Sequence, residues 1–546
     1  MSDFRNSTVY QIYIKSFCDS NGDGIGDLNG IRSRLDYLKD LGVDYLWITP
    51  FFLSPMNDNG YDVADYYSIN PMFGTMDDAD ALIQEAADRG IGLMFDMVFN
   101  HTSTDHEWFQ KALAGDPVYM DYYIFKDPVD GHAPTNWESK FGGNAWEYVP
   151  SLGKYYLHLF DVSQADLNWE NPTVREELAK VLRFWKKKGV SGFRFDVVNL
   201  ISKPFVYEDD HQGDGRRFYT DGPKIHQYLK ELVEAGGIAG DMTVGEMSST
   251  SLDNCVRYAN PAEKELKMVF SFHHLKVDYK DGQKWALKAP DYAELRSLFK
   301  TWQEGMQAKD AWNALFWCNH DQPRAVSRFG DDRNYWKESA RSLAMLIHLM
   351  RGTPYIYQGE ELGMTNAYFT DISQYRDVES TNYFRILKEG GASTEEALEI
   401  IAARSRDNGR TPMQWDASEG AGFTTGTPWL GIPANHVTIN AKTEAEDPES
   451  ILAFYKELVR LRKEMEIIAD GQIRFIESGQ DSILAYERTL GNEKLTVYCS
   501  VSGEELALAE PVSLEGKEIL LSSYLDQPAG PVASLRPFEA IAVYEK

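Results

Sequence analysis

An arginine and an aspartate stand two residues apart in the short apolar run 192–198, at Arg194 and Asp196. An apolar run that follows a helical stretch is typical of a buried parallel strand, and side chains two apart on a strand point to the same face. The Arg194 guanidinium would therefore favour the ionised form of Asp196 and lower its pKa. An ionised carboxylate at a strand end can act as a nucleophile, although a structural ion pair would give the same pattern.

Polar side chains also end three other apolar runs. They are Asp96, Asn100 and His101 after one run, Glu246 after a second, and Asn319, His320 and Asp321 after a third. Carboxylates with imidazoles, without a cysteine nucleophile or a histidine-rich metal set, suggest acetal chemistry, in which one carboxylate attacks and another protonates the leaving oxygen. Glu246 has no arginine two residues away, so burial is predicted to raise its pKa, as a general acid requires.

These side chains need a scaffold that gathers strand ends, and the chain alternates strands with helices as parallel α/β folds do. Helices are predicted over 29–41, 76–89, 175–188, 224–235, 337–350 and 449–464. Strands are predicted over 9–13, 45–49, 91–99, 192–198, 242–245, 268–272, 313–318 and 353–357. Eight strands with interleaved helices predict an α/β fold of the (β/α)8 TIM-barrel class, whose active site lies at the carboxyl ends of the strands.

The alternation of strand and helix is interrupted in two places. Residues 102–172 are rich in aromatic residues, glycine and proline and show no sustained helical period, which predicts a subdomain inserted after the third strand. From about residue 467 the pattern changes to short alternating strands, which predicts a C-terminal antiparallel β domain. The expected domains are the barrel (1–101 and 173–466), the inserted subdomain (102–172) and the C-terminal domain (467–546).

The bulk composition restricts the partners. The 546 residues carry a formal net charge of −29, which argues against nucleic acid or an anionic membrane as a partner. The four cysteines are scattered without a Cys-x-x-Cys motif, so neither a disulfide framework nor a zinc site is expected. No stretch of about 18 apolar residues occurs. We therefore expect a cytoplasmic protein, and a monomer.

Oxygen-bearing side chains alternate with glycine near the N-terminus. Asp19, Asn21, Asp23 and Asp27 occupy positions 1, 3, 5 and 9 of a loop resembling the first part of an EF-hand, and the Ile25 carbonyl occupies position 7. Position 12 is glycine, so the bidentate glutamate is missing and a true EF-hand is excluded. The pattern predicts a structural Ca²⁺ or Mg²⁺ site, with a metal-free turn as the alternative.

Four of these stretches resemble the signature regions of the α-amylase superfamily, glycoside hydrolase family 13. They are 96–101, 192–196, 245–246 and 319–321, in the order expected along the barrel. The stretch 164–168 resembles a fifth region, with Ala165 where proline is more usual. The resemblance implies a retaining mechanism with Asp196 as nucleophile, Glu246 as acid/base and Asp321 as a third carboxylate that holds sugar hydroxyls.

The resemblance also implies a substrate pocket. His101, Arg194 and His320 would line one sugar subsite. In the oligosaccharide-acting branch of the family, an aspartate and an arginine close that pocket, and they match Asp62 and Arg410 here. Their pairing would make the enzyme exo-acting. An ordinary turn aspartate and a surface arginine are the alternatives.

Longer stretches narrow the resemblance to the branch of the family that hydrolyses trehalose 6-phosphate. They are 136–143, 213–222, 242–251, 272–279 and 312–324. This implies a small sugar phosphate as substrate, glucose and glucose 6-phosphate as products, and no organic cofactor. Residues 273–284 gather three lysines and two histidines, and a sugar phosphate would need such a cationic pocket in this acidic protein. The resemblance favours Lys276 and Lys284 as phosphate ligands, followed by His274, over a solvated charged loop.

Other functions stay open. An oligo-1,6-glucosidase, an α-glucosidase or a sucrose isomerase of the same branch would share the catalytic regions. A non-catalytic sugar-binding or transporter-associated subunit would have lost the carboxylates that are present here at Asp196, Glu246 and Asp321. A metal-dependent hydrolase would need a ligand cluster at the catalytic face.

Overall fold

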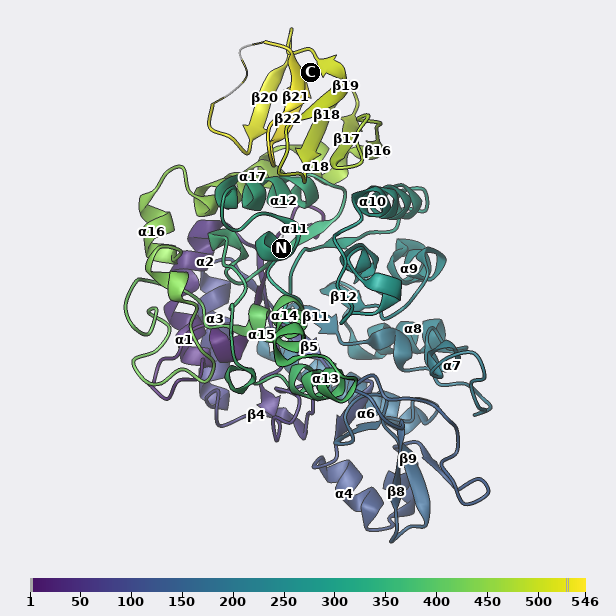
Figure 1. Ribbon diagram of the computed structural model, residues 1–546. Coiled ribbons are helices and arrows are strands. Elements are labelled where there is room, and N and C mark those ends of the chain that lie inside the picture. The colour runs from purple at the N-terminus through teal and green to yellow at the C-terminus, as the bar shows by residue number, and fades with distance from the viewer. Residues whose placement is uncertain (1–2, 527, 529) are drawn as a thin grey trace. The chain divides into compact units, whose positions relative to one another are not determined.

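The computed structural model describes residues 3–526, 528 and 530–546 (Figure 1). The chain forms two compact units. The terminal unit comprises Met1–Leu46, Arg89–Ile91 and Phe272–Lys546, and the central unit comprises Trp47–Asp88 and Gly92–Ser271. Strand β2 (Tyr45–Ile48) has residues in both.

Four parallel strands form the sheet of the central unit. They are β5 (Gly92–Met97), β11 (Gly192–Phe195), β12 (Met242–Glu246) and β13 (Met268–Phe270), adjacent in that order. The register places Arg194 of β11 beside Asp96 of β5 and Val244 of β12. Helices α3 (Met76–Asp88), α6 (Pro172–Lys188), α7 (Arg216–Tyr219), α8 (Ile225–Gly236) and α9 (Leu252–Ala259) separate or follow the strands.

Capping residues determine where helix α6, which precedes strand β11, begins and ends. The Asn171 side chain accepts a hydrogen bond from the Thr173 amide, and Pro172 occupies the first helical position, where a missing N–H costs nothing. The helix buries Leu178, Leu182 and other apolar side chains at helical spacing. It ends at Gly189, whose φ of 111° is accessible to glycine at little cost. Strand β11 therefore begins at a defined point.

The region 102–172 has more regular structure than its sequence predicted. It contains the short helices α4 (Glu107–Leu113) and α5 (Pro117–Met120), which the sequence analysis did not predict. Both helices are too short for periodicity to reveal them, and each begins at a capping side chain, His106 or Asp116. The same region contains β6 (His101–Ser103) paired with β10 (Gln164–Asp166), and a sheet of β7 (Phe125–Lys126), β9 (Lys154–Leu157) and β8 (Trp146–Val149).

The terminal unit contains three further parallel strands, β1 (Val9–Ile12), β15 (Thr353–Tyr357) and β14 (Ala314–Leu315), adjacent in that order. The seventh predicted strand, 313–318, is thus reduced to two residues. Helices of this unit are α1 (Leu28–Ser33), α2 (Leu35–Leu41), α10 (Tyr292–Gln307), α11 (Ala325–Phe329), α12 (Trp336–His348), α13 (Val378–Glu389), α14 (Thr394–Arg404), α15 (Asp407–Arg410), α16 (Ala441–Glu446), α17 (Ile451–Glu464) and α18 (Glu466–Asp470).

The C-terminal part is antiparallel, as predicted (Figure 1, yellow). One sheet has the order β16 (Gln472–Phe475), β17 (Ile483–Leu490), β18 (Glu493–Ser500), β22 (Ala540–Glu545) and β20 (Glu518–Ser522), and a second pairs β19 (Leu506–Val512) with β21 (Val532–Leu535). Side chains of both sheets form one apolar core, which includes Ile483, Leu535 and Ile541. Against the barrel helix α12, the Tyr486 hydroxyl donates to the Leu346 carbonyl at 2.8 Å.

None of the helices that the structure describes is long and apolar enough to cross a membrane.

Candidate active site

A single guanidinium joins three carboxylates in the central unit. Arg194 Nη1 donates to Asp96 Oδ1 at 2.6 Å and to Asp196 Oδ1 at 2.8 Å, and Nη2 donates to Glu246 Oε2. The parallel register places Asp96 beside Arg194, and Glu246 lies two residues beyond the partner of Arg194 on β12. The structure therefore brings together Arg194, Asp196 and Glu246, three of the residues predicted for the site.

Glu246 has an arginine neighbour in the fold, although none stands two residues away in the sequence. The guanidinium reaches Glu246 from the adjacent strand rather than from two positions along its own chain. Spacing within one strand does not reveal this contact, because pairing between adjacent strands decides it. The raised pKa predicted for Glu246 stays a prediction.

Asp96 holds the arginine in place. Its side chain has no exposed surface, and its second oxygen accepts hydrogen bonds from Trp47 Nε1 and the Tyr61 hydroxyl, both at 3.0 Å. Burial raises the pKa of Asp96, although the Arg194 guanidinium opposes that shift. The Trp47 ring lies 4.9 Å from the Arg194 guanidinium. The sequence placed Asp96 at a strand end but gave no sign of this supporting role.

Asp196 and Glu246 differ from Asp96 in their access to solvent. Their side chains are 10% and 16% exposed. The residue after Asp196, Val197, has φ 35° and ψ 38°. A β-branched residue in this left-handed region is strained, and such strain is characteristic of functional sites. The backbone therefore turns sharply at the point where the Asp196 carboxylate becomes accessible.

His101 and Asp62 also lie in the central unit. Burial lowers the pKa of His101 to about 3, so the imidazole is neutral, and its Nε2 donates to the Tyr61 carbonyl at 3.0 Å. Asp62 accepts hydrogen bonds from the Ser54 hydroxyl and the Asn57 and Asp58 amides at 2.8–3.1 Å. These bonds are those of a turn aspartate, and the pairing of Asp62 with Arg410 stays a prediction.

The third predicted carboxylate, Asp321, lies in the terminal unit. Several cationic or imidazole groups contact it, whereas Asp196 and Glu246 share a single guanidinium. Asp321 Oδ1 accepts from Arg410 Nη2 at 2.7 Å and lies 3.4 Å from Arg406 Nη1, while Oδ2 lies 3.2 Å from His320 Nε2. Burial acts to raise the pKa of Asp321, but the surrounding cations outweigh it and hold the pKa well below its usual range. Gln11 Nε2 lies 2.8 Å from His320 Nδ1 and fixes the ring.

Arg406 and Asp377 belong to the same cluster and were missed. Arg406 donates through Nε and Nη2 to Asp377 Oδ1 at 2.9 and 2.7 Å. Arg410 also donates through Nε to the His320 carbonyl at 2.8 Å, so it is a buried residue rather than a surface arginine. The one available signal was the density of charge in 404–410, where three arginines occur in seven residues.

The predicted phosphate ligands have three different environments. Lys284 Nζ pairs with Glu379 Oε2 at 2.6 Å, and its charge contributes to the lowered pKa of Asp321. Lys276 is an exposed residue at the end of a 3-10 turn, His273–Lys276. His274 is buried, and its Nε2 donates to the Phe316 carbonyl at 2.8 Å. The environment of His274 favours a structural role over phosphate binding.

The oxygens of the predicted metal loop are engaged within the protein. Asp19 accepts from the amides of Asn21, Gly22 and Gly24 and from the Thr424 hydroxyl, and Asp27 accepts from Ser20 and caps α1 at Gly30. Asn21 and Asp23 each accept from the amide two residues on. At Gly24 a Cβ would lie 1.8 Å from the Thr427 carbonyl oxygen, so glycine is required there. Within the described residues, no group of three or more His, Cys, Asp or Glu is placed to hold a metal ion.

Known proteins resemble this chain over its whole length. The family "Alpha amylase, catalytic domain" matches residues 11–471. The trehalose-6-phosphate hydrolase of Bacillus subtilis is 53% identical over 98% of this chain and 97% of its own length. The oligo-1,6-glucosidase of Parageobacillus thermoglucosidasius is 46% identical over 98% of each.

The crystal structure of the Bacillus licheniformis trehalose-6-phosphate hydrolase superposes with a TM-score of 0.95, at 51% identity over 99% of each chain. The (β/α)8 fold class predicted from the sequence is thereby confirmed. From the match to its catalytic domain and from these relatives, the chain belongs to the α-amylase family.

Proposed function

We propose that this protein is a retaining exo-acting glycoside hydrolase that cleaves trehalose 6-phosphate to glucose and glucose 6-phosphate. The observation that carries the chemistry is the pair Asp196 and Glu246, partly exposed on adjacent parallel strands and held by one guanidinium. The substrate is supported by the relatives, since the Bacillus subtilis protein with 53% identity is a trehalose-6-phosphate hydrolase.

In the proposed mechanism Asp196 attacks the anomeric carbon while Glu246 protonates the departing glycosidic oxygen. A water molecule, deprotonated by Glu246, then releases glucose from the covalent intermediate. Arg194 holds Asp196 ionised, because a guanidinium 2.8 Å away favours the charged carboxylate. Asp321 binds sugar hydroxyls as an anion, consistent with its lowered pKa.

The sugar that occupies this subsite would also contact the two histidines and the pair Asp62 and Arg410. Burial keeps His101 neutral, and its two ring nitrogens bond to the Tyr61 carbonyl and the Asn100 amide, so it would shape the wall of the subsite without adding charge. His320 is oriented by Gln11. Asp62 and Arg410 would close the subsite beyond one glucose, which makes the cleavage exo-acting.

We propose that Lys276 and Lys284 bind the phosphate, with His274 supporting the loop from the protein interior. To test this, Lys276→Ala and Lys284→Ala are compared on trehalose 6-phosphate and on an uncharged aryl α-glucoside. A phosphate role predicts that kcat/KM falls for trehalose 6-phosphate and not for the aryl glucoside. Equal loss on both substrates, or no loss on either, would show that these lysines do not bind phosphate.

A substrate panel tests the proposed activity against a second candidate. The 46% identity to an oligo-1,6-glucosidase favours isomaltose as the alternative substrate. We expect kcat/KM for trehalose 6-phosphate to exceed that for isomaltose and for sucrose. A preference for isomaltose, or isomerisation of sucrose, would contradict the proposal.

We also propose that the loop 19–27 binds a structural Ca²⁺ or Mg²⁺ through Asp19, Asn21, Asp23, Asp27 and the Ile25 carbonyl. Asn21 Oδ1 and Asp23 Oδ1 each accept one amide hydrogen bond and keep a lone pair for a cation. Both Asp19 oxygens accept two hydrogen bonds, so a cation would have to displace some of these donors. Addition of Ca²⁺ to chelator-treated protein is expected to raise Tm, and Asp23→Asn should reduce that increase. An unchanged Tm would leave the loop as a metal-free turn.

The four cysteines Cys18, Cys255, Cys318 and Cys499 are all free thiols. Free thiols are typical of proteins in a reducing compartment, which supports a cytoplasmic location. We propose that the enzyme acts there as a monomer, without nucleic-acid or membrane partners. Light scattering after size-exclusion chromatography tests the oligomeric state.

A further inference from the structure

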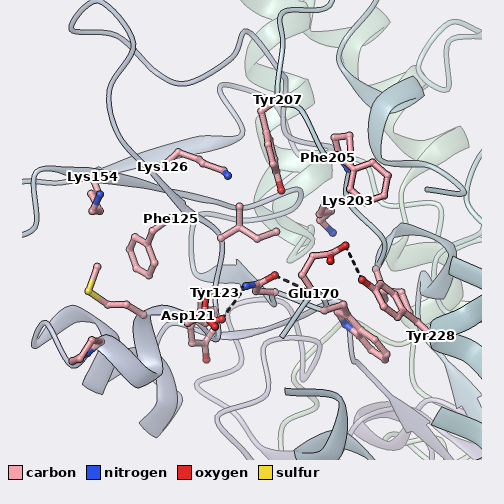
Figure 2. Close-up of a pocket in the computed structure, with 17 residues that line it drawn as sticks. Asp121, Tyr123, Phe125, Lys126, Lys154, Glu170, Lys203, Phe205, Tyr207 and Tyr228 are labelled. Atoms are coloured by element: carbon pink, nitrogen blue, oxygen red, sulfur yellow. Dashed lines mark hydrogen bonds between the residues drawn. The ribbon is translucent and has the colours of Figure 1, made fainter. Parts of the chain in front are cut away.

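A cavity of about 610 Å³ lies in the central unit (Figure 2). Its volume falls in the range of small-molecule sites. None of Arg194, Asp196 and Glu246 lines it. Its walls combine lysines, acidic and amide side chains, and aromatic rings, chiefly Asp121, Phe125, Lys126, Lys154, Glu170 and Tyr207.

Lys126 supplies the positive charge of this cavity. Its Nζ lies 4.4 Å from the Tyr207 ring centroid, and Figure 2 shows both side chains reaching into the cavity. Among the described residues no carboxylate lies within 4.0 Å of the Lys126 amine. Partial burial lowers the pKa of Lys126. The Tyr207 ring positions this cation without neutralising it, which is unusual in a chain of net charge −29.

The other two lysines are less available than Lys126. Lys154 lies on the strand paired with that of Lys126 and contacts Asp127 at 2.5 Å. Because Lys126 is paired with Tyr155, the Lys154 side chain points to the opposite face of the sheet. Lys203 is buried and donates to the Asn100 side chain and the Leu200 carbonyl at 2.8 and 2.7 Å. Lys126 is therefore the lysine that can receive an anion here, whereas Lys154 is paired with Asp127 and Lys203 is committed to the fold.

The remaining walls suit hydroxyl groups and a ring. Glu170 is held by the Tyr228 hydroxyl at 2.7 Å and by Lys224 at 2.5 Å, so a fixed carboxylate faces the cavity as a hydrogen-bond acceptor. Phe205, at the rim, is 67% exposed. Exposed aromatic rings beside fixed polar groups are typical of sites for ligands that present both an apolar face and polar edges.

We propose that this cavity is a second binding site, for a phosphorylated hexose. Its phosphate would contact Lys126 through charge-assisted hydrogen bonds. Its ring would lie against Phe205, and its hydroxyls would face Glu170. The choice of a hexose phosphate rests on the proposed function, whose product is glucose 6-phosphate, while the cationic and aromatic walls do not depend on that activity.

The test uses glucose 6-phosphate and a reporter inside the cavity. Trp169 lines it, so full-length protein labelled with 5-fluorotryptophan gives a local ¹⁹F signal, assigned with Trp169→Phe. Titration with glucose 6-phosphate is expected to shift the Trp169 signal saturably. Lys126→Gln should weaken this binding at least tenfold, and Lys126→Arg should retain most of it. Lys187→Gln, a charge-matched control on the exposed side of α6, should bind as the unaltered protein does.

Three outcomes would overturn the proposal. They are an unshifted Trp169 signal in the unaltered protein, equal affinity in Lys126→Gln, and an equal response to inorganic phosphate, which would reduce the site to an anion contact. The Trp169 signal of each unliganded variant shows whether the cavity has kept its structure. Hydrolysis of trehalose 6-phosphate is measured separately, so a failure of the proposed activity is distinguishable from a failure of this site.

Discussion

Two charged clusters in this chain use the same residue types in opposite proportions. In the central unit one guanidinium, Arg194, contacts three carboxylates. In the terminal unit one carboxylate, Asp321, is surrounded by two guanidiniums and an imidazole. In the first arrangement three carboxylates share one guanidinium, and in the second a single carboxylate contacts several donors.

This difference in neighbours suggests different functional roles for carboxylates that cannot be told apart in the sequence. Asp196 and Glu246 share the Arg194 guanidinium with Asp96, and both side chains are partly exposed, so a substrate can reach them. Asp321 is held strongly ionised by its neighbours, which suits a residue that binds hydroxyls and never exchanges a proton. The number of cationic and imidazole neighbours around each carboxylate thus separates the proposed reacting groups from the proposed binding group.

Removing the reacting carboxylates should have the largest effect. Asp196→Asn and Glu246→Gln are expected to lower kcat roughly 10⁴-fold or more, because a covalent mechanism depends on both groups. Removing a group that binds the ground state and the transition state equally would instead raise KM and leave kcat unchanged. A higher KM in Asp321→Asn would therefore indicate that Asp321 binds the substrate rather than reacting with it. Steady-state kinetics of Asp196→Asn, Glu246→Gln and Asp321→Asn test this. Full activity of Asp196→Asn would remove it as the nucleophile.

Removing the shared cation is the next largest change. Arg194→Met leaves Asp96 buried without its charged partner, and breaking a buried pair typically costs about 3–5 kcal/mol. Urea unfolding should show this loss together with a loss of activity. The double variant Arg194→Met/Asp96→Asn should recover part of the stability and none of the activity. Unchanged stability in the single variant would mean that Arg194 contributes nothing to the fold.

The effects of the two arginines around Asp321 on kcat/KM should differ in size. Arg410 donates at 2.7 Å to Asp321 and also to the His320 backbone, whereas Arg406 lies 3.4 Å from Asp321 and binds mainly Asp377. Loss of a hydrogen bond to a charged group costs about 1.5–3 kcal/mol, so Arg410→Gln should lower kcat/KM on the order of 10- to 100-fold. Arg406→Gln should have the smaller effect. The reverse ranking would mean that Arg406 orders the cluster.

The smallest effect is a difference in pH dependence. The pKa of Asp321 is lowered from its ordinary value of 3.8, so its stabilising contribution is present above pH 3.8 and is lost as the pH falls towards the folded pKa. The pKa of Asp96 is raised, so ionised Asp96 destabilises the fold above its folded pKa, and that penalty is relieved as the pH falls. Urea unfolding of Asp321→Asn and Asp96→Asn from pH 6 to pH 3 should therefore show opposite trends relative to the unaltered protein. Parallel trends would contradict the contrast between the clusters.

Some predictions from the sequence succeeded because they depended on local pattern. The strand 353–357 has the predicted bounds, and α3 and α17 lie within two residues of theirs. The pair Arg194 and Asp196 was found because period-2 spacing on a strand places both on one face. Helices α4 and α5 were missed because they are shorter than the window that periodicity needs.

What the sequence determined by itself was the order of strands and helices and the identity of the acidic and basic residues at the strand ends. Those properties depend on nearest neighbours and on residue type. The tertiary structure alone decided that Arg194 reaches Glu246 across strands, that Asp96 is buried beneath them, and that Arg406 and Asp377 join Asp321. These contacts join residues 52 to 98 positions apart within one cluster and 29 to 89 apart in the other, and such contacts arise from strand register and loop packing.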